Sequence, residues 1–182
     1  MKSVLISISP KWCVFIASGE KTIEVRKTKP KIEIPFKCYI YCTGIKSMNL
    51  RDYVVAHQAT GGAVDDWSGK VIGEFVCNCI TGLKADNGIQ TYYNRQNGTC
   101  LSDAEIIKYA SGKKVYYWHI SDLKIYDKPK ELGNFWKADK CDYATESGCT
   151  YKHHCFRAGQ TQRCGETLTR PPQSWCYVEE LP

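Results

Sequence analysis

Short apolar stretches separated by turns run through most of the sequence, and they predict a fold rich in β-strands. One stretch alternates in polarity, with Ile23 and Val25 on one face and polar side chains on the other, which is typical of a half-buried strand. The last long apolar stretch predicts either one strand or two strands around a bend at residues 121–122. The predicted strands are residues 4–8, 22–27, 36–42, 70–79, 115–126 and 174–181.

Helical spacing of apolar residues occurs in three short segments. Ser9 is a good helix N-cap, Pro10 suits the first helical position, and Gly19 ends this first helix. A second helix is expected at residues 47–57, and the capping box at residues 102–105 (S-D-A-E) opens a third. Because the order of elements is rich in strands and does not repeat βαβ units, we expect an α+β fold, a small mixed β-barrel with short peripheral helices.

Residues 137–173 differ from the rest of the chain, because they lack apolar periodicity and carry four cysteines and two histidines. A segment of that length inside a compact domain is functional, disordered or cross-linked. We therefore predict a barrel in residues 1–136, a Cys-rich insertion in 137–173, and a terminal strand in 174–182 that closes the barrel.

The formal net charge of +6 is unevenly spread along the chain. Residues 1–40 carry eight Lys or Arg against three Asp or Glu, and residues 105–140 carry eight against five. This pattern indicates either a face for polyanions such as nucleic acid or simply a soluble surface. No apolar run reaches the ~18 residues of a membrane span. The first apolar run is too short for a secretion signal, so we expect a cytoplasmic protein with reduced cysteines and no membrane partner.

The strongest candidate for a functional site is the stretch at residues 19–26, which reads G-x-K-x-x-E-x-R. Strand parity places Glu24 and Arg26 on one face, with Lys21 at the preceding turn. Two cations around one carboxylate can grip a phosphate or a base edge, and the carboxylate can accept from an exocyclic amine. The alternative is an ordinary solvated strand face. The sequence contains no Walker loop, dinucleotide fingerprint, H-E-x-x-H or G-x-S-x-G motif.

A strand, an S-P helix start and then G-x-K-x-x-E-x-R resembles the ASCH domain, a branch of the PUA-like superfamily. The stretches at 69–75 and 116–132 also look like strands of phage and bacterial ASCH proteins. The resemblance implies a PUA-like barrel whose cleft beside the first helix binds RNA or modified nucleotides. By this resemblance, Lys21, Glu24 and Arg26 line the cleft and Gly19 shapes its mouth.

An enzyme is the alternative reading. One ASCH subgroup removes acyl groups from the N4 of cytidine, and other members are linked to RNA cleavage, so the resemblance also allows a hydrolase acting on an acylated nucleoside or on RNA. Lys21 and Glu24 would then be the catalytic residues. The acyl hydrolases have threonine where this chain has Glu24, and a carboxylate cannot replace a hydroxyl nucleophile directly. Glu24 would also hold Lys21 protonated, which makes it a poorer base.

Several aromatic residues could stack on bases, but most aromatic residues on strands belong to the core. Trp12 is the best candidate for a ligand contact, because it lies on the helix beside the motif. His119 is expected to be a satisfied hydrogen-bonding residue rather than a general base. The aromatic candidates are Trp12, Trp118, Trp175 and Tyr177.

The Cys-rich segment suggests a structural zinc site, since four thiolates in a segment without its own core match tetrahedral zinc. Its first two gaps, C-x7-C-x5-C, match those of CCCH zinc fingers, but no histidine follows at the expected place. Free cysteines on a loop, or a zinc-held loop that recognises a protein partner, are the alternatives. The candidate ligands are Cys141, Cys149, Cys155 and Cys164, with His153 or His154 as a substitute fourth ligand.

Overall fold

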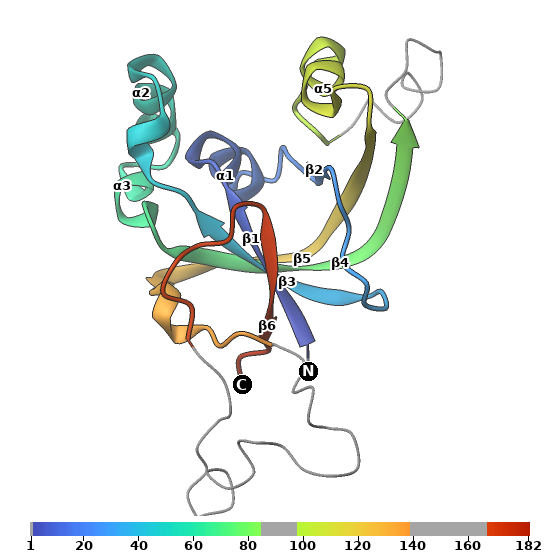
Figure 1. Cartoon of the computed structure of the whole chain (residues 1–182). Helices are drawn as coiled ribbons and strands as arrows, with labels where there is room; N and C mark the ends of the chain where they lie inside the picture. The colour runs from blue at the N-terminus through green and yellow to red at the C-terminus, as the bar shows by residue number, and fades with distance from the viewer. Residues whose placement is uncertain (1, 85–97, 139–166) are drawn as a thin grey trace, which may run out of the picture.

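The computed structural model describes residues 2–84, 98–138 and 167–182 (Figure 1). Six strands form one mixed sheet in the order β2-β5-β4-β3-β1-β6, in which β1 and β3 pair in parallel and the other pairs are antiparallel. The α+β class expected from the sequence is confirmed. The strands are β1 (Lys2–Ile8), β2 (Ile23–Arg26), β3 (Phe36–Cys42), β4 (Val71–Lys84), β5 (Lys114–Lys130) and β6 (Trp175–Glu179).

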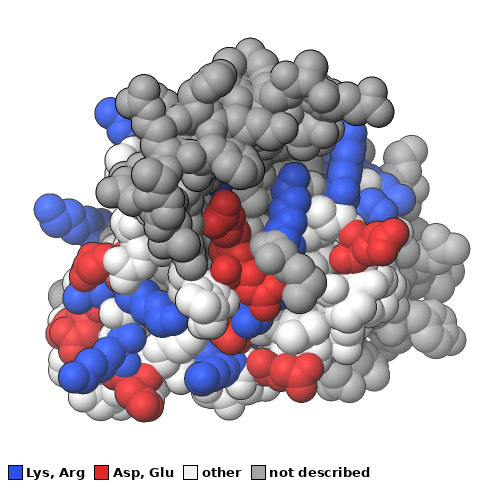
Figure 2. Space-filling view, turned by 90° about the horizontal axis from the view of Figure 1, so that it is seen from below, with Lys and Arg blue, Asp and Glu red and all other residues white. Residues whose placement is uncertain are grey.

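Short helices lie mainly in the upper half of the molecule in Figure 1, around the ends of β1 and β2. None of the helices within the described ranges is long and apolar enough to cross a membrane. The face seen from below mixes Lys and Arg with Asp and Glu, without a field of one sign among the described residues (Figure 2). The helices are α1 (Pro10–Ala17), α2 (Leu50–Ala59), α3 (Ala63–Trp67) and α5 (Asp103–Ala110), with 3-10 turns at Ile45–Ser47 and Leu132–Asn134.

The sheet curves because β4 and β5 pair with irregular register. Glu74 pairs with Lys124 and Val76 with Ser121, so β5 carries one extra residue at this point. Asp122 lies there with a φ of 48°, and this is the bend that the sequence predicts. Gly73 faces the same stretch, where a Cβ would lie only 2.4 Å from the backbone oxygen of Lys124. A glycine is therefore required for β4 to approach β5 at the bend.

The described strands do not close into a ring, because the hydrogen-bonded order ends at β2 and β6. The terminal strand instead extends the sheet beside β1, where Leu5 pairs with Cys176. Side chains bridge the seam: Trp175 Nε1 donates to Thr28 Oγ1 at 2.9 Å, and the backbone N–H of Lys31 donates to the Tyr177 hydroxyl at 2.6 Å. The seam between the two sheet ends is thus held by side-chain contacts rather than by a backbone ladder.

The main core lies between the sheet and α1, and it contains several of the cysteines. Cys13, Cys38 and Cys77 are fully buried, as the strand and helix patterns predict. Burial raises the pKa of the Cys77 thiol to about 12 and raises those of Cys13 and Cys38 well above their ordinary value. These thiols therefore stay protonated and act as small apolar side chains.

Candidate functional site

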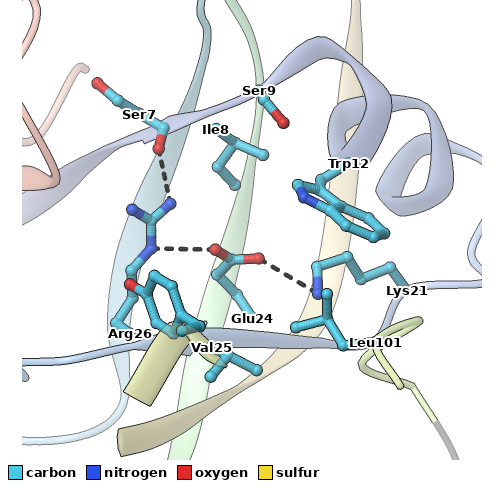
Figure 3. Close-up of a pocket in the computed structure, with 10 residues that line it drawn as sticks. Ser7, Ile8, Ser9, Trp12, Lys21, Glu24, Val25, Arg26 and Leu101 are labelled. Carbon is cyan, nitrogen blue, oxygen red and sulfur yellow. Dashed lines mark hydrogen bonds and ion pairs between the residues drawn. The ribbon is translucent and has the colours of Figure 1, made fainter. Parts of the chain in front are cut away.

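A pocket of about 210 Å³ opens where the end of β1, the start of α1 and strand β2 meet (Figure 3). Three of its lining residues belong to the G-x-K-x-x-E-x-R motif, and the rest come from β1, α1, β2 and the segment around α5. We call this the motif pocket. Its lining residues are Ser7, Ile8, Ser9, Trp12, Lys21, Glu24, Val25, Arg26, Leu101 and Tyr109.

The turn between α1 and β2 delivers the motif to this pocket. Gly19 follows α1 with a φ of 79°, a left-handed conformation that side chains disfavour. The backbone N–H of Lys21 then donates to the carbonyl of Phe15 at 2.8 Å, which turns the chain back toward the sheet. Gly19 itself is exposed and is not among the residues that line the pocket, so its role in shaping the mouth stays a prediction.

Strand β2 is covered on both of its faces. Ile23 and Val25 pack with Ile106 of α5 on one side, while Glu24 and Arg26 face the interior beside β1 and α1. All four residues of β2 are buried, whereas the sequence predicts a strand with one exposed polar face. The prediction of a half-buried strand is wrong here, because strand periodicity does not reveal that α5 covers one face and that β1 and α1 cover the other.

Lys21, Glu24 and Arg26 form a buried charged triad. The Lys21 ammonium lies 3.4 Å from Glu24 Oε2, and Arg26 Nε lies 3.0 Å from Glu24 Oε1 (Figure 3). The residues expose only 2%, 6% and 9% of their surface, respectively. Charges so deeply buried are tolerated only when they are paired and hydrogen-bonded, and removing one partner from such a group typically costs about 3–5 kcal/mol.

Each cation also binds backbone oxygens. Lys21 Nζ donates to the carbonyls of Ile23 at 2.8 Å and Thr99 at 2.6 Å, so with Glu24 it has three acceptors for its three N–H groups. Arg26 Nη2 donates to the carbonyl of Ser7 at 2.6 Å, which ties β2 to β1. The triad is therefore a fixed part of the fold as well as a lining of the pocket.

The solved structures most informative for this arrangement belong to an ASCH protein from Zymomonas mobilis. The unsubstituted protein is 19% identical and matches with a TM-score of 0.55, over 98% of this chain and 88% of that chain. Two single-substitution variants of it match with the same TM-score, at 19% and 18% identity, over 92% and 89% of their chains. No protein-family model matches the sequence, and no curated protein sequence matches it.

The fold is that of an ASCH domain. The comparison covers nearly the whole chain, so the PUA-like fold expected from the motif is confirmed. At this level of identity the likeness concerns the fold alone, and the role of the pocket is argued below from its own side chains.

Trp12 forms one wall of the motif pocket in this ASCH fold. Its indole ring is half-buried, and the Lys21 ammonium lies 5.3 Å from the ring centroid. The hydroxyl of Ser9, at the start of α1, also lines the pocket and makes no hydrogen bond to a described residue. An aromatic ring, a hydroxyl and a charged floor thus converge on one small cavity.

Tyr109 and Leu101 line the pocket, although the sequence did not mark them as site residues. Both come from the part of the chain around α5, far along the sequence from the motif. Thr99 belongs to the same segment and supplies a carbonyl to Lys21. The capping box at Ser102 and Glu105 predicts α5, but nothing in the sequence predicts that α5 packs beside β2.

Basic and aromatic residues lie just after β2, on α5 and at the start of β5. The Lys27 ammonium lies 5.0 Å from the centroid of the Tyr109 ring. The Tyr116 ring has Lys29 at 6.0 Å and Lys114 at 5.3 Å from its centroid. All three lysines are exposed. We call these five residues the basic strip.

The remaining aromatic candidates lie in or against the core. Trp118 is fully buried and contacts the rings of Phe36 and Trp175. Trp175 and Tyr177 are partly buried on β6 and hold the seam of the sheet. Only Trp12 among the four aromatic candidates lines the motif pocket.

The candidate zinc ligands Cys141, Cys149, Cys155 and Cys164 lie outside the described residues. Within residues 2–84, 98–138 and 167–182, no group of three His, Cys, Asp or Glu side chains is arranged to hold a metal ion. The structural zinc therefore stays a prediction from the sequence.

Proposed function

We propose that the motif pocket binds one base of a single-stranded RNA or of a modified nucleotide. The observation that carries the proposal is the combination of a small cavity, an aromatic wall at Trp12 and the charged triad. A cavity of about 210 Å³ is below the range of roughly 300–1,000 Å³ that holds drug-sized ligands. It suits a single flat base, and stacking of a base on an aromatic side chain contributes about 1–3 kcal/mol.

The basic strip supports a polymer as the ligand rather than an isolated base. Lys27 is an exposed cation beside the pocket residue Tyr109, and the exposed Lys29 and Lys114 lie against a second ring, that of Tyr116. Alternating cations and aromatic rings beside a base pocket are typical of proteins that bind single-stranded nucleic acid. The phosphates that flank the bound base would lie along this strip.

A larger hollow of about 910 Å³ lies between α1 and α2, but it is a weaker candidate for a small-ligand site. Its charged lining residues, which include Lys11, Arg51 and Asp52, are exposed or only half-buried. Specific sites depend on a few polar groups in fixed positions. The motif pocket has such groups in the triad.

Hydrolysis is supported less well than binding by this arrangement. Lys21 Nζ donates to two backbone carbonyls and pairs with Glu24, so its contacts hold it within the fold rather than against a substrate proton. The Ser7 hydroxyl donates to the carbonyl of Pro172 at 2.7 Å, away from Glu24. Among the described residues, no hydroxyl is hydrogen-bonded to Lys21 or Glu24 as an activated nucleophile would be.

Binding of a fluorescent single-stranded RNA octamer to the Trp12→Leu variant tests the proposal. We expect the variant to lose about 1–3 kcal/mol of binding free energy. The Trp12→Phe variant keeps a ring and should bind nearly as well as the wild type. Tyr53→Leu, on α2 outside the pocket, is the matched control. Unchanged affinity of a correctly folded Trp12→Leu variant would contradict the proposal.

A second readout is the salt dependence of the same binding. For a single strand, the slope of log K against log salt has a magnitude of roughly 0.7 for each phosphate that the protein neutralises. The Lys27→Ala, Lys29→Ala double variant neutralises two phosphates fewer, so the magnitude of its slope should be smaller by roughly 1.4. Lys124→Ala, Lys128→Ala, farther along β5, is the control and should leave the slope unchanged.

A further inference from the structure

The hydrogen-bonding groups of the motif pocket indicate which base it accepts. The choice of base rests on the proposed function and concerns the same motif pocket. It depends on which donors and acceptors of the charged triad are still free once the contacts within the fold are counted.

Contacts within the fold account for several donors of the two cations. Lys21 has three acceptors, namely the carbonyls of Ile23 and Thr99 and the carboxylate of Glu24. Arg26 forms an ion pair with Glu24 through Nε, which makes no hydrogen bond to a described residue, and donates from Nη2 to the Ser7 carbonyl. Its Nη1 lies 3.4 Å from Ser174 Oγ, so the guanidinium is directed toward β1 and β6.

The carboxylate of Glu24, by contrast, keeps free acceptor capacity. An ionised carboxylate has about four lone-pair sites on its two oxygens. Arg26 Nε lies 3.0 Å from Oε1 and the Lys21 ammonium 3.4 Å from Oε2 as ion pairs, and Arg26 Nε makes no hydrogen bond to a described residue, so each carboxylate oxygen keeps at least one acceptor site. Figure 3 shows the Glu24 carboxylate between the two cations, with Ile8 and Trp12 above this row of charges in the view.

A phosphate group is a poor match for this floor. It carries only acceptors at neutral pH, and its negative charge would be repelled by the Glu24 carboxylate that lies between the two cations. A group that donates two hydrogen bonds side by side fits both free sites at once. Because the Trp12 ring forms the wall, that donor edge belongs to a flat ring.

We propose that the motif pocket is selective for guanine, whose N1–H and N2 amino group form two adjacent donors. Cytosine and adenine place one amino donor beside an unprotonated ring nitrogen, which would face a carboxylate oxygen. Uracil has a single ring N–H between two carbonyl groups. Guanine is the one standard base that can donate to both Glu24 oxygens together, and the Ser9 hydroxyl offers a further polar contact in the same pocket.

The test uses wild-type protein and the hexanucleotides UUXUUU, in which X is guanine, inosine, adenine, cytosine or uracil. A paired base contact of this kind discriminates about 5- to 150-fold against the wrong base. We expect the guanine strand to bind tighter than each of the other four by a factor in that range. Inosine is the sharpest comparison, because it differs from guanine only in lacking the N2 amino group.

Equal affinity for guanine and inosine would overturn the proposal, and so would a preference for another base. If the five strands bind equally and binding still depends on Trp12, the selectivity for guanine is wrong and the proposed base-binding function stands. If no strand binds, both are wrong. The Glu24→Gln variant, which has one amide oxygen and one amide donor, should lose the preference for guanine. The strand series on wild-type protein decides the matter even if that variant is unstable.

Discussion

Glu24 Oε2 lies 3.4 Å from the Lys21 ammonium, and their side chains expose only 8% and 2% of their surface. The pair joins the turn after α1 to strand β2, and Arg26 extends it to the carbonyl of Ser7 on β1. The same side chains thus line the pocket and connect three elements of the fold. A substitution in the triad consequently affects stability as well as binding.

The first prediction concerns the stability of the triad. Lys21→Met leaves two buried backbone carbonyls without this donor and removes one of the two cations paired with the buried Glu24 carboxylate. We expect the free energy of unfolding to fall by about 3–5 kcal/mol, measured by urea denaturation. Lys27→Met, at an exposed lysine of the basic strip, should change it by less than about 0.5 kcal/mol. Equal and small effects of both substitutions would show that the triad does not stabilise the fold.

The second prediction concerns the seam, where the segment that follows β2 contacts strand β6. The Tyr177 hydroxyl accepts a hydrogen bond from the backbone N–H of Lys31, so Tyr177→Phe removes a contact that spans the seam. A single hydrogen bond of this kind contributes about 0.5–1.5 kcal/mol. Hydrogen exchange at the Lys31 amide should become faster, while exchange at Ile40, in the middle of the sheet, should not change. Unaltered exchange at Lys31 would mean that this contact does not hold the seam.

The third prediction is a pH dependence at the start of α5. The Ser102 hydroxyl and backbone N–H donate to the Glu105 carboxylate and, with weaker attraction from Lys11, lower its pKa from the ordinary value of 4.5. Because this pKa is lower in the folded than in the unfolded state, Glu105 stabilises the fold above about pH 4.5. That contribution is lost as the pH falls through the lower, folded-state pKa.

Glu105→Gln should therefore be less stable than the wild type at pH 7, and the difference should shrink as the pH falls below about 4.5. Thermal unfolding at several pH values measures this. Glu33→Gln, at an exposed glutamate outside the helices, is the control. A difference that stays constant with pH would contradict the ionic contribution of the capping box.

The fourth prediction concerns thiol reactivity. Cys100 is exposed, although partial desolvation raises the pKa of its thiol too, whereas Cys13, Cys38 and Cys77 are buried with raised pKa values. Brief treatment of the native protein with iodoacetamide at pH 8, followed by peptide mass mapping, should modify Cys100 and leave the three buried thiols free. Denatured protein should be modified at all four. Labelling of the three buried thiols in native protein would contradict the core packing described above.

The fifth prediction is a structural zinc ion held by the Cys-rich segment. We expect metal analysis of the purified protein to find about one zinc per chain. Cys149→Ser should lose it, while Cys100→Ser, outside the segment, should retain it. A wild-type protein without zinc, purified without chelators, would favour the alternative of free cysteines.

The sequence predicts the local elements well. Strand β3 spans the predicted residues 36–42, the capping box at Ser102 and Glu105 is present, and β5 bends at Asp122. These features depend on neighbouring residues, since strand periodicity, helix capping and turn preferences are local properties. The motif likewise predicts that the charged triad forms, because Lys21, Glu24 and Arg26 are close in sequence.

The sequence does not predict the parts of the site that arise from distant segments. Thr99 and Tyr109 reach the motif because α5 packs against the apolar face of β2. The same packing buries a strand that its own pattern predicts as half-exposed. Strand parity assigns Glu24 and Arg26 to one face, but only the tertiary arrangement determines that this face is covered by β1 and α1.

The most direct test of the central claim, that a base binds against Trp12, is the indole ¹H–¹⁵N NMR spectrum during titration with single-stranded RNA. The chain has five tryptophans, and each gives its own indole signal. We predict that the Trp12 signal shifts progressively to saturation while that of Trp67, buried away from the motif pocket, stays in place. A saturating titration that leaves the Trp12 signal unchanged would contradict the account.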